Sequence, residues 1–269
     1  MIRKKRSDNL KNYKLIIRYD GTGYKGWEHQ PGEEKTIQGK MEKAVIRMLD
    51  PSGDGSVSLG SFEGDIPEII SAGRTDGGVS ALAMCANVHL KTELSRERIR
   101  DDLNRNLPDD ICVISVEEVP DRFHARYNAT GKTYRYTCYA GKLKPVFDRR
   151  YCYELGSIPD IAEMKKAAGY IIGEHDFKAF CGNPHVKKSC VRCVDKIDIV
   201  FENERLTFTY HGNGFLQYMV RIMTGTLLEV GLGKRSAESV KDVIESRDRS
   251  KAGFTAPARG LALVEVDYD

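Results

Sequence analysis

The residues best suited to carry out chemistry lie in one glycine-rich segment, SAGRTDGGVSA at positions 71–81. This segment places a guanidinium, Arg74, and a carboxylate, Asp76, among three glycines. Glycine permits positive φ and the close approach of a ligand, so a carboxylate on such a loop can be placed against a substrate with little steric cover. The same residues also suit a tight turn in which Asp76 accepts hydrogen bonds from backbone amides. Residue types alone leave both interpretations open.

A second glycine motif follows the first predicted strand, where Gly21, Gly23 and Gly26 have the spacing of a dinucleotide-binding fingerprint. That fingerprint holds a pyrophosphate only where a helix begins at the motif. Here Pro31 and Gly32 interrupt any such helix. The HRD and DFG tripeptides of protein kinases do not occur in the sequence. We therefore expect no nucleotide cofactor.

Four side chains near the middle of the second half could together bind zinc: Cys181, His185, Cys190 and Cys193. The chain has no second Cys-x-x-Cys pair, and the pair that it has is flanked by valines, as on a strand. The alternative is a set of small buried thiols beside a basic loop. We expect no metal.

The seven cysteines are an odd number in a chain of 269 residues, which argues against a disulfide framework and for reduced thiols. No apolar run approaches the ~20 residues that cross a bilayer. The basic N-terminus lacks the apolar stretch of a secretory signal. We expect a cytoplasmic protein that does not use a membrane.

Basic and aromatic residues are concentrated between Arg122 and Arg150. This stretch holds eight Lys or Arg residues, six Phe or Tyr residues and a single acidic residue, Asp148. Basic side chains neutralise phosphates, and aromatic rings stack on unpaired bases. The composition is typical of a nucleic-acid-binding surface, although a tyrosine-rich pair of strands with a solvated charged face would have the same composition.

Hydrophobic periodicity predicts the same order of elements in both halves of the chain. In the first half, strands are expected at 13–20, 69–71, 84–90 and 111–119, and helices at 36–49 and from 95 onwards. In the second half, strands are expected at 133–140, 194–201, 206–210 and 261–268, and helices at 159–173, 216–230 and 236–246. Each half therefore has the β-α-β-β-α-β order of a ferredoxin-like domain. The prediction is an α+β fold of two ferredoxin-like halves, with antiparallel sheets side by side and helices on one face.

The expected boundaries are a basic N-terminal arm at 1–12, an N-terminal domain at 13–120 that carries the loop 71–81, and a C-terminal domain at 121–269. Positions 51–67 are rich in Gly, Ser and acidic residues, and are expected to form a long inserted loop.

The segment GRTDGGVSA, from Gly73 to Ala81, resembles the catalytic signature GRTDAGVHA of the TruA family of tRNA pseudouridine synthases. Further segments resemble motifs of that family in the same order: YDGTGYKGW at 19–27, TIQ at 36–38, FHAR at 123–126, KTYRY at 132–136, FLQYMVR at 215–221 and APARGLAL at 256–263. The similarity runs from about position 13 to position 268.

This resemblance implies an isomerase that converts uridine to pseudouridine at positions 38, 39 and 40 of the tRNA anticodon stem-loop. It also implies a homodimer and a basic cleft between the two halves. The resemblance places the catalytic nucleophile on Asp76 and its basic partner on Arg221. It places the aromatic ring that stacks on the target base on Tyr134, an RNA contact on Arg74, and an apolar wall of the active site on Leu261.

Two positions depart from the family signature: Gly77 stands where the family usually has Ala, and Ser80 where it has His. Neither position carries the chemistry in the family, so we expect an altered loop or RNA contact rather than an inactive enzyme. Cys190 also stands where the family has a small residue.

Pseudouridine formation breaks the N1–C1′ bond, turns the uracil and rejoins it through C5, so it requires no cofactor. The carboxylate of Asp76 would either attack C1′ or remove a proton at the ribose 2′ position, and the sequence does not choose between them. The main rival is a non-catalytic RNA-binding protein with paired ferredoxin-like domains, which explains the basic aromatic stretch but not the segment 73–81. A zinc-dependent RNA deaminase would need His-x-Glu and Pro-Cys-x-x-Cys motifs, and neither is present.

Overall fold

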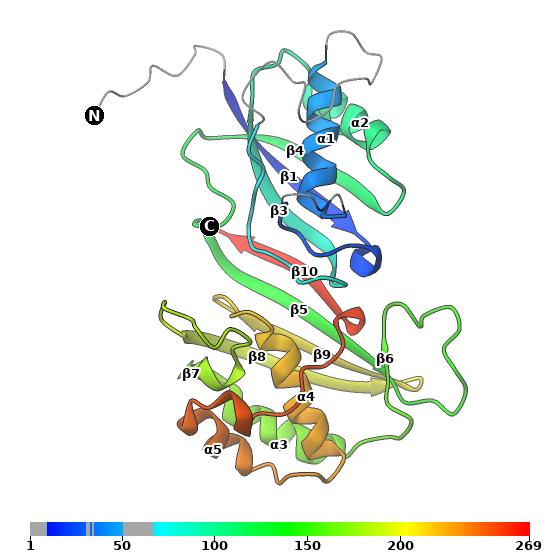
Figure 1. The fold of residues 1–269 in the computed structure, drawn as a ribbon, viewed down its shortest axis with the longest axis vertical. Coiled ribbons are helices and arrows are strands. Elements are labelled where there is room, and N and C mark those ends of the chain that lie inside the picture. The colour runs from blue at the N-terminus through cyan, green and yellow to red at the C-terminus, as the bar shows by residue number, and fades with distance from the viewer. Residues whose placement is uncertain (1–9, 31–32, 34, 51–66) are drawn as a thin grey trace. The chain divides into compact units, whose positions relative to one another are not determined.

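The computed structural model describes residues 10–30, 33, 35–50 and 67–269, which form two compact units (Figure 1). The first unit comprises Met1–Ala129 together with Asp269, and the second comprises Thr130–Tyr268. Sequence analysis placed this boundary between 120 and 121. Most of the expected N-terminal arm and of the 51–67 insertion lies outside the described residues, although Lys11 and Asn12 already belong to the first strand.

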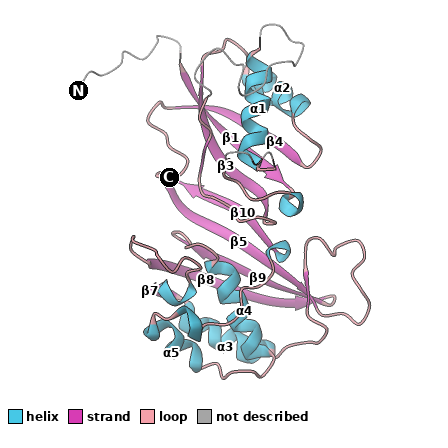
Figure 2. Ribbon diagram, viewed as in Figure 1, coloured by secondary structure: helices cyan, strands magenta, loops and turns pink. Residues whose placement is uncertain are grey.

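The first unit contains, in its described residues, a small antiparallel sheet and two α-helices. Its elements are β1 (Lys11–Tyr19), the 3-10 turn η1 (Gly21–Gly23), α1 (Ile37–Leu49), β2 (Ile70–Ser71), β3 (Ser80–Leu90), α2 (Arg96–Asn106) and β4 (Ile111–Val119). The strand order is β4-β1-β3, with β2 paired to β3 (Figure 2).

The core of the first unit follows from the alternation of β1. Tyr13, Leu15, Ile17 and Tyr19 are buried while the residues between them are more exposed, as expected for a strand with one covered face. Both helices begin at the predicted cap, because the hydroxyls of Thr36 and Ser95 accept hydrogen bonds from Gly39 N and Arg98 N. α1 and α2 pack against each other and cover the sheet.

The second unit contains a larger sheet and three α-helices. Its elements are β5 (Ala129–Tyr139), β6 (Tyr153–Glu154), α3 (Ile161–Ile171), β7 (Gly173–Asp176), η2 (Phe177–Phe180), β8 (Val191–Glu202), β9 (Arg205–Gly212), α4 (Met219–Gly231), α5 (Ser239–Ser246), η3 (Arg249–Lys251), η4 (Ala258–Gly260) and β10 (Leu261–Tyr268). The strand order is β10-β5-β9-β8-β7, and β6 lies parallel to β5.

Two local features shape the second unit. The β8–β9 hairpin turns at Asn203 and Glu204, which both have positive φ, the geometry that matches the twist of the flanking strands. α4 is buried along nearly its whole length and packs against α3. The sheet and α4 therefore form the core of this unit.

The predicted mixed α+β class is confirmed, and so are the order and type of the predicted helices and strands. Boundaries differ by up to four residues, as at β3, β5 and α4. β3 begins at Ser80 rather than at position 84, and α4 begins at Met219 rather than at 216 because Tyr218 adopts left-handed geometry with φ of 60°. The short strands β6 and β7 were not predicted, since two to four residues carry too little periodicity to recognise. None of the described helices is long and apolar enough to cross a membrane.

Candidate functional site

Asp76 lies in the connection between β2 and β3, within a turn that closes when Val79 N donates to Asp76 O at 3.1 Å. Gly78 follows with φ of +81°, a conformation that favours glycine. The preceding residue, Thr75, is buried and its hydroxyl lies 2.8 Å from the hydroxyl of Tyr19 on β1. The half-buried Asp76 is thus held on a loop anchored to the core of the first unit.

The glycine motif at 21–26 braces this loop. Trp27 N donates to Thr75 O at 3.0 Å, and Gly78 N donates to Tyr24 O at 3.1 Å. A Cβ at Gly26 would lie 2.7 Å from Thr75 O, and Gly26 has φ of +109°. These glycines therefore allow two backbones to lie in contact.

No described α-helix starts at this motif, which contains only the three-residue 3-10 turn η1, since α1 begins at Ile37. The helix N-terminus that a dinucleotide site needs is therefore not at Gly26. The motif resembles the fingerprint in its letters but has a different structural role.

The two departures from the family signature have local explanations. The Ser80 hydroxyl accepts a hydrogen bond from Gly21 N at 3.0 Å, so Ser80 joins the loop to its brace. A Cβ at Gly77 would meet the backbone of Lys25 at 3.4 Å, an ordinary contact that an alanine could make. Neither residue distorts the turn that carries Asp76.

Arg74 precedes Asp76 by two residues, is exposed, and forms an ion pair with Glu28. Sequence analysis did not anticipate Glu28, because the partner lies in a segment distant along the chain. An exposed guanidinium with a single carboxylate partner retains donors for a phosphate.

Tyr134 lies on β5 in the second unit and is half-buried. Its ring meets the ring of Phe215 edge to face, with centroids 5.2 Å apart and planes at 82°. This T-shaped contact fixes the ring plane of Tyr134. Phe215 is a supporting residue that the family motif at 215–221 contains but that sequence analysis gave no role.

Arg221 lies in the first turn of α4, and its Nε donates to Ala256 O at 2.8 Å. Ala256 N in turn donates to Arg221 O at 3.1 Å. The guanidinium also lies over the ring of Tyr218, with Cζ 4.9 Å from the ring centroid. The two late motifs, 215–221 and 256–263, therefore contact each other directly.

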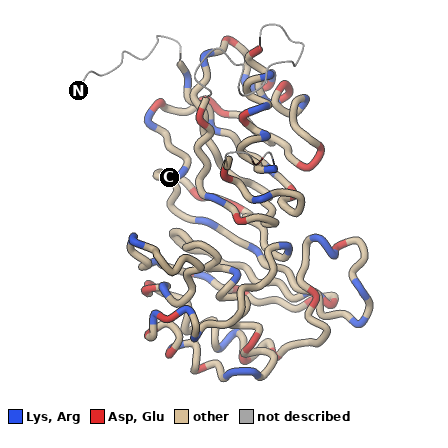
Figure 3. The backbone as a smooth tube through the Cα atoms, in the orientation of Figure 1, with Lys and Arg blue, Asp and Glu red and all other residues tan. Residues whose placement is uncertain are grey.

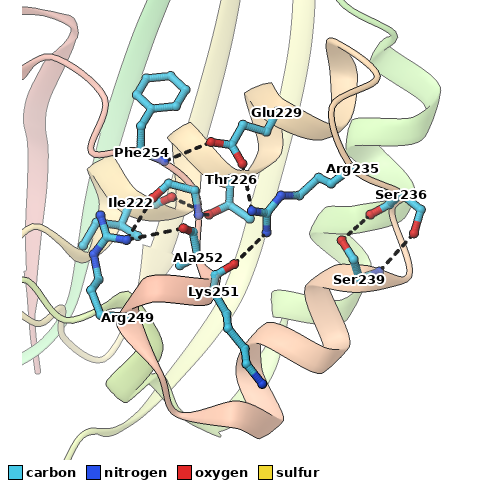
Figure 4. Close-up of polar contacts among 11 residues, drawn as sticks. Ile222, Thr226, Glu229, Arg235, Ser236, Ser239, Arg249, Lys251, Ala252 and Phe254 are labelled. Atoms are coloured by element: carbon cyan, nitrogen blue, oxygen red, sulfur yellow. Dashed lines mark hydrogen bonds and ion pairs between the residues drawn. The ribbon is translucent and has the colours of Figure 1, made fainter.

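Polar contacts hold the segment before Ala256 against α4 (Figure 4). Phe254 N donates to Glu229 Oε1 at 3.1 Å, and Arg235 joins Glu229, at 2.8 Å, to Lys251 O, at 3.0 Å. Arg249 donates to Gly253 O at 3.0 Å. The segment that contacts Arg221 through Ala256 is thus itself held in place by hydrogen bonds and an ion pair.

Leu261 is 6% exposed and is the first residue of β10. The preceding segment is tied to β5, because the hydroxyl of Tyr136 donates to Pro257 O at 2.8 Å. Burial raises the pKa of Tyr136, which keeps its hydroxyl protonated as a donor. Leu261 therefore follows a firmly attached corner of the second unit.

The five predicted site residues divide between the units: Arg74 and Asp76 share one loop of the first unit, and Tyr134, Arg221 and Leu261 belong to the second. Basic residues of the predicted stretch are similarly divided, and Figure 3 shows several of them on the loop between β5 and β6.

The candidate zinc ligands do not form a cluster. Cys181 and Cys190 are buried, whereas His185 is exposed. Among the residues that the structure describes, no group of three or more His, Cys, Asp or Glu side chains is arranged to hold a metal ion. Burial raises the pKa of Cys190, as expected for a small buried thiol.

The sequence profile of the family described as tRNA pseudouridine synthase matches residues 15–128 and 167–269. The chain belongs to the tRNA pseudouridine synthase family. Three relatives called tRNA pseudouridine synthase A agree with this. Those of Acetivibrio thermocellus, Clostridium kluyveri and Bacillus sp. strain KSM-64 are 41%, 40% and 42% identical over 259 residues, which cover 96% of this chain and 100% of each relative.

Membership of the tRNA pseudouridine synthase family covers both units, since the two matched ranges include the loop of Asp76 and the helix of Arg221. Pseudouridine synthases are isomerases, so the enzyme class predicted from the sequence is confirmed.

Proposed function

We propose that this protein converts uridine to pseudouridine in tRNA, at positions 38, 39 and 40 of the anticodon stem-loop. The observation that carries the proposal is the rigid presentation of Asp76. Its loop is anchored through Thr75 to Tyr19 and braced by the backbone of residues 24–27. A carboxylate on a tight, glycine-flanked turn can approach the ribose of an extruded nucleotide without obstruction from neighbouring side chains.

The reaction assigns a separate task to each residue. Asp76 would attack C1′ of the ribose or remove a proton at its 2′ position, and either step requires the ionised carboxylate. Arg221 would pair with that carboxylate in the RNA-bound enzyme, because an adjacent guanidinium favours the charged form. The reaction transfers no external group and changes no oxidation state, so these residues suffice without a cofactor.

Base extrusion has its own energetic requirement. Taking a nucleotide out of its stack costs a few kcal/mol. Stacking on an aromatic ring restores about 1–3 kcal/mol. Tyr134 is suited to this task because its ring is held edge-on by Phe215. Leu261 would supply apolar contact at the same site.

We also infer that each unit is a ferredoxin-like domain. In both, the strands of the β-α-β-β-α-β unit are ordered fourth, first, third, second, as β4-β1-β3-β2 and β10-β5-β9-β8. The two domains that we propose correspond to these units; sequence analysis placed their boundary between 120 and 121 and expected a basic arm at 1–12. A homodimer in the cytoplasm is the expected state, and light scattering of the purified protein tests the oligomeric state.

Nucleoside analysis of tRNA incubated with the purified protein tests the function. The wild-type protein should produce pseudouridine, and Asp76→Asn should lower the rate by at least about 10³-fold while tRNA affinity stays within about threefold. Asp109→Asn, which changes an exposed carboxylate of the same unit, is the control and should retain full activity. A normal product yield from Asp76→Asn would refute the assignment, and tRNA binding without product from the wild type would favour the non-catalytic RNA-binding alternative.

A further inference from the structure

A pocket of about 310 Å³ lies in the first unit beside the loop of Asp76. Its lining includes Gly73 and Arg74 of this loop, Trp27, and the aromatic residues His124 and Tyr127. Pockets for small ligands have volumes of about 300–1,000 Å³, so this one suits a single group of nucleotide size. None of the functions assigned above uses the side chains of His124 or Tyr127.

His124 and Tyr127 form an aromatic wall of the pocket. The rings of His124 and Tyr127 have centroids 4.1 Å apart and planes at 33°. Tyr127 is 79% exposed, although a large aromatic side chain gains free energy by burial. An unstacked base lying on this ring would remove apolar surface from water and add stacking energy.

Charged and polar groups border the same wall. Arg126 is exposed, and its guanidinium makes no ion pair with another residue that the structure describes. His124 Nδ1 accepts hydrogen bonds from the backbone amides of Arg126, at 3.2 Å, and Tyr127, at 3.3 Å. The Nε2 atom of His124 is therefore the protonated nitrogen and a hydrogen-bond donor. Arg126 and His124 therefore offer hydrogen-bond donors to a phosphate and to the edge of a base.

The turn that carries these residues is fixed by two buried amides. Asn87 Oδ1 accepts from Ala125 N at 2.8 Å, and Asn87 Nδ2 donates to Asn12 Oδ1 at 3.1 Å. Asn12 Nδ2 donates to Phe123 O at 2.9 Å. Asn12 and Asn87 are 2% and 0% exposed. Because the backbone of this turn is already fixed, ligand binding does not carry the entropic cost of ordering it, which favours affinity.

We propose that this pocket binds an unstacked nucleotide that neighbours the target uridine in the RNA strand, with its base on Tyr127 and its phosphate facing Arg126. This proposal rests on the proposed function. Arg74 lines the pocket and Asp76 follows two residues later, a span of at most about 7 Å along the chain. One RNA strand can therefore present the target uridine to Asp76 and place the neighbouring nucleotide in the pocket.

Steady-state kinetics on an anticodon stem-loop RNA tests the pocket. Tyr127→Ala should raise KM about tenfold, the effect of losing one base–aromatic stack, and leave kcat within about twofold, because stacking holds substrate and transition state alike. Tyr127→Phe keeps the ring and should behave as the wild type. Arg126→Ala should also raise KM, whereas Arg96→Ala, at an exposed arginine of α2 outside the pocket, should not.

Trp27 gives a second readout, because it is the single tryptophan of the chain and lines the pocket. Adding the RNA should change its fluorescence in the wild type and in Arg96→Ala, but much less in Tyr127→Ala at the same RNA concentration. The thermal midpoint of Tyr127→Ala should equal that of the wild type, because an exposed ring contributes little to folding.

The two proposals fail in different ways. A wild-type protein that binds RNA but makes no pseudouridine contradicts the proposed function, while the Trp27 signal still reports whether RNA enters the pocket. If the wild type is active, and Tyr127→Ala and Arg126→Ala have the same KM and the same Trp27 response as Arg96→Ala, the proposed role of the pocket is wrong.

Discussion

The role of Arg221 follows from the chemistry of its guanidinium group. A guanidinium carries five N–H donors in a planar fork, and Nε is used by Ala256 O at 2.8 Å. The terminal nitrogens can then form a two-pronged contact with a carboxylate, which a point charge cannot reproduce. Arginine at position 221 therefore attaches α4 to the segment of Ala256, and in the proposed function it would also orient Asp76.

Arg221→Lys should lower kcat about ten- to a hundredfold while the chain stays folded, because the ammonium keeps the charge but loses the fork. Single-turnover kinetics on tRNA measures the effect. Arg96→Lys on the exposed side of α2 is the control, with an expected rate equal to that of the wild type. Wild-type turnover in Arg221→Lys would show that the proposed pairing with Asp76 is not needed.

The helix α4 shows how one element positions a functional group through close packing. A Cβ at Gly225 would lie 1.8 Å from Phe254 O, and one at Gly253 would lie 2.7 Å from Thr226 N. The helix and the 249–256 segment therefore touch backbone to backbone. Gly253 N also donates to the Thr226 hydroxyl at 2.9 Å. This contact sets where Ala256 meets Arg221.

Gly225→Ala should destabilise the protein by about 1–3 kcal/mol or more, since a backbone carbonyl must move to admit the methyl group. Gly169→Ala on α3 makes the same change where an added Cβ meets nothing within 4 Å. It should stabilise the helix by up to about 1 kcal/mol. Urea unfolding of both variants compares them directly, and equal shifts would contradict the packing argument.

The free energy of unfolding of the whole protein should depend on pH through His211. Its Nδ1 lies 2.6 Å from Asp195, the residue at the bulge of β8, and its Nε2 lies 2.9 Å from Asp267 on β10. The hydrogen bond to Asp195, with a further one to Asp267, raises the pKa of His211. The imidazolium thus joins three strands of the second unit.

The direction of the pKa shift of His211 gives the sign of the pH dependence of stability. Because the folded-state pKa lies above the ordinary value of about 6.5, the stabilisation is complete below that pH and is lost as pH rises through the folded-state pKa. His211→Asn should lower the free energy of unfolding most near pH 6 and least near pH 9. His185→Asn, at an exposed position, should show no such trend. A pH-independent effect of His211→Asn would contradict the ion-pair explanation.

The sequence by itself determined the order and type of the predicted elements, the family and the loop of Asp76. Periodicity, capping residues such as Thr36 and Ser95, and the motif at 73–81 are local, so their signals survive in a one-dimensional string. Sequence analysis also assigned Tyr134 and Arg221 to a site, but only through resemblance to a family.

Only the tertiary structure decided what holds these residues in place. The contact of Gly26 with Thr75, the Asn12–Asn87 pair beneath the turn of Tyr127, and the bond from Arg221 to Ala256 each join segments far apart in the chain. Such contacts depend on strand register and close approach of backbones, which no single segment encodes. The pocket beside the loop of Asp76 is likewise lined by segments far apart in the chain, so it exists only in the folded protein.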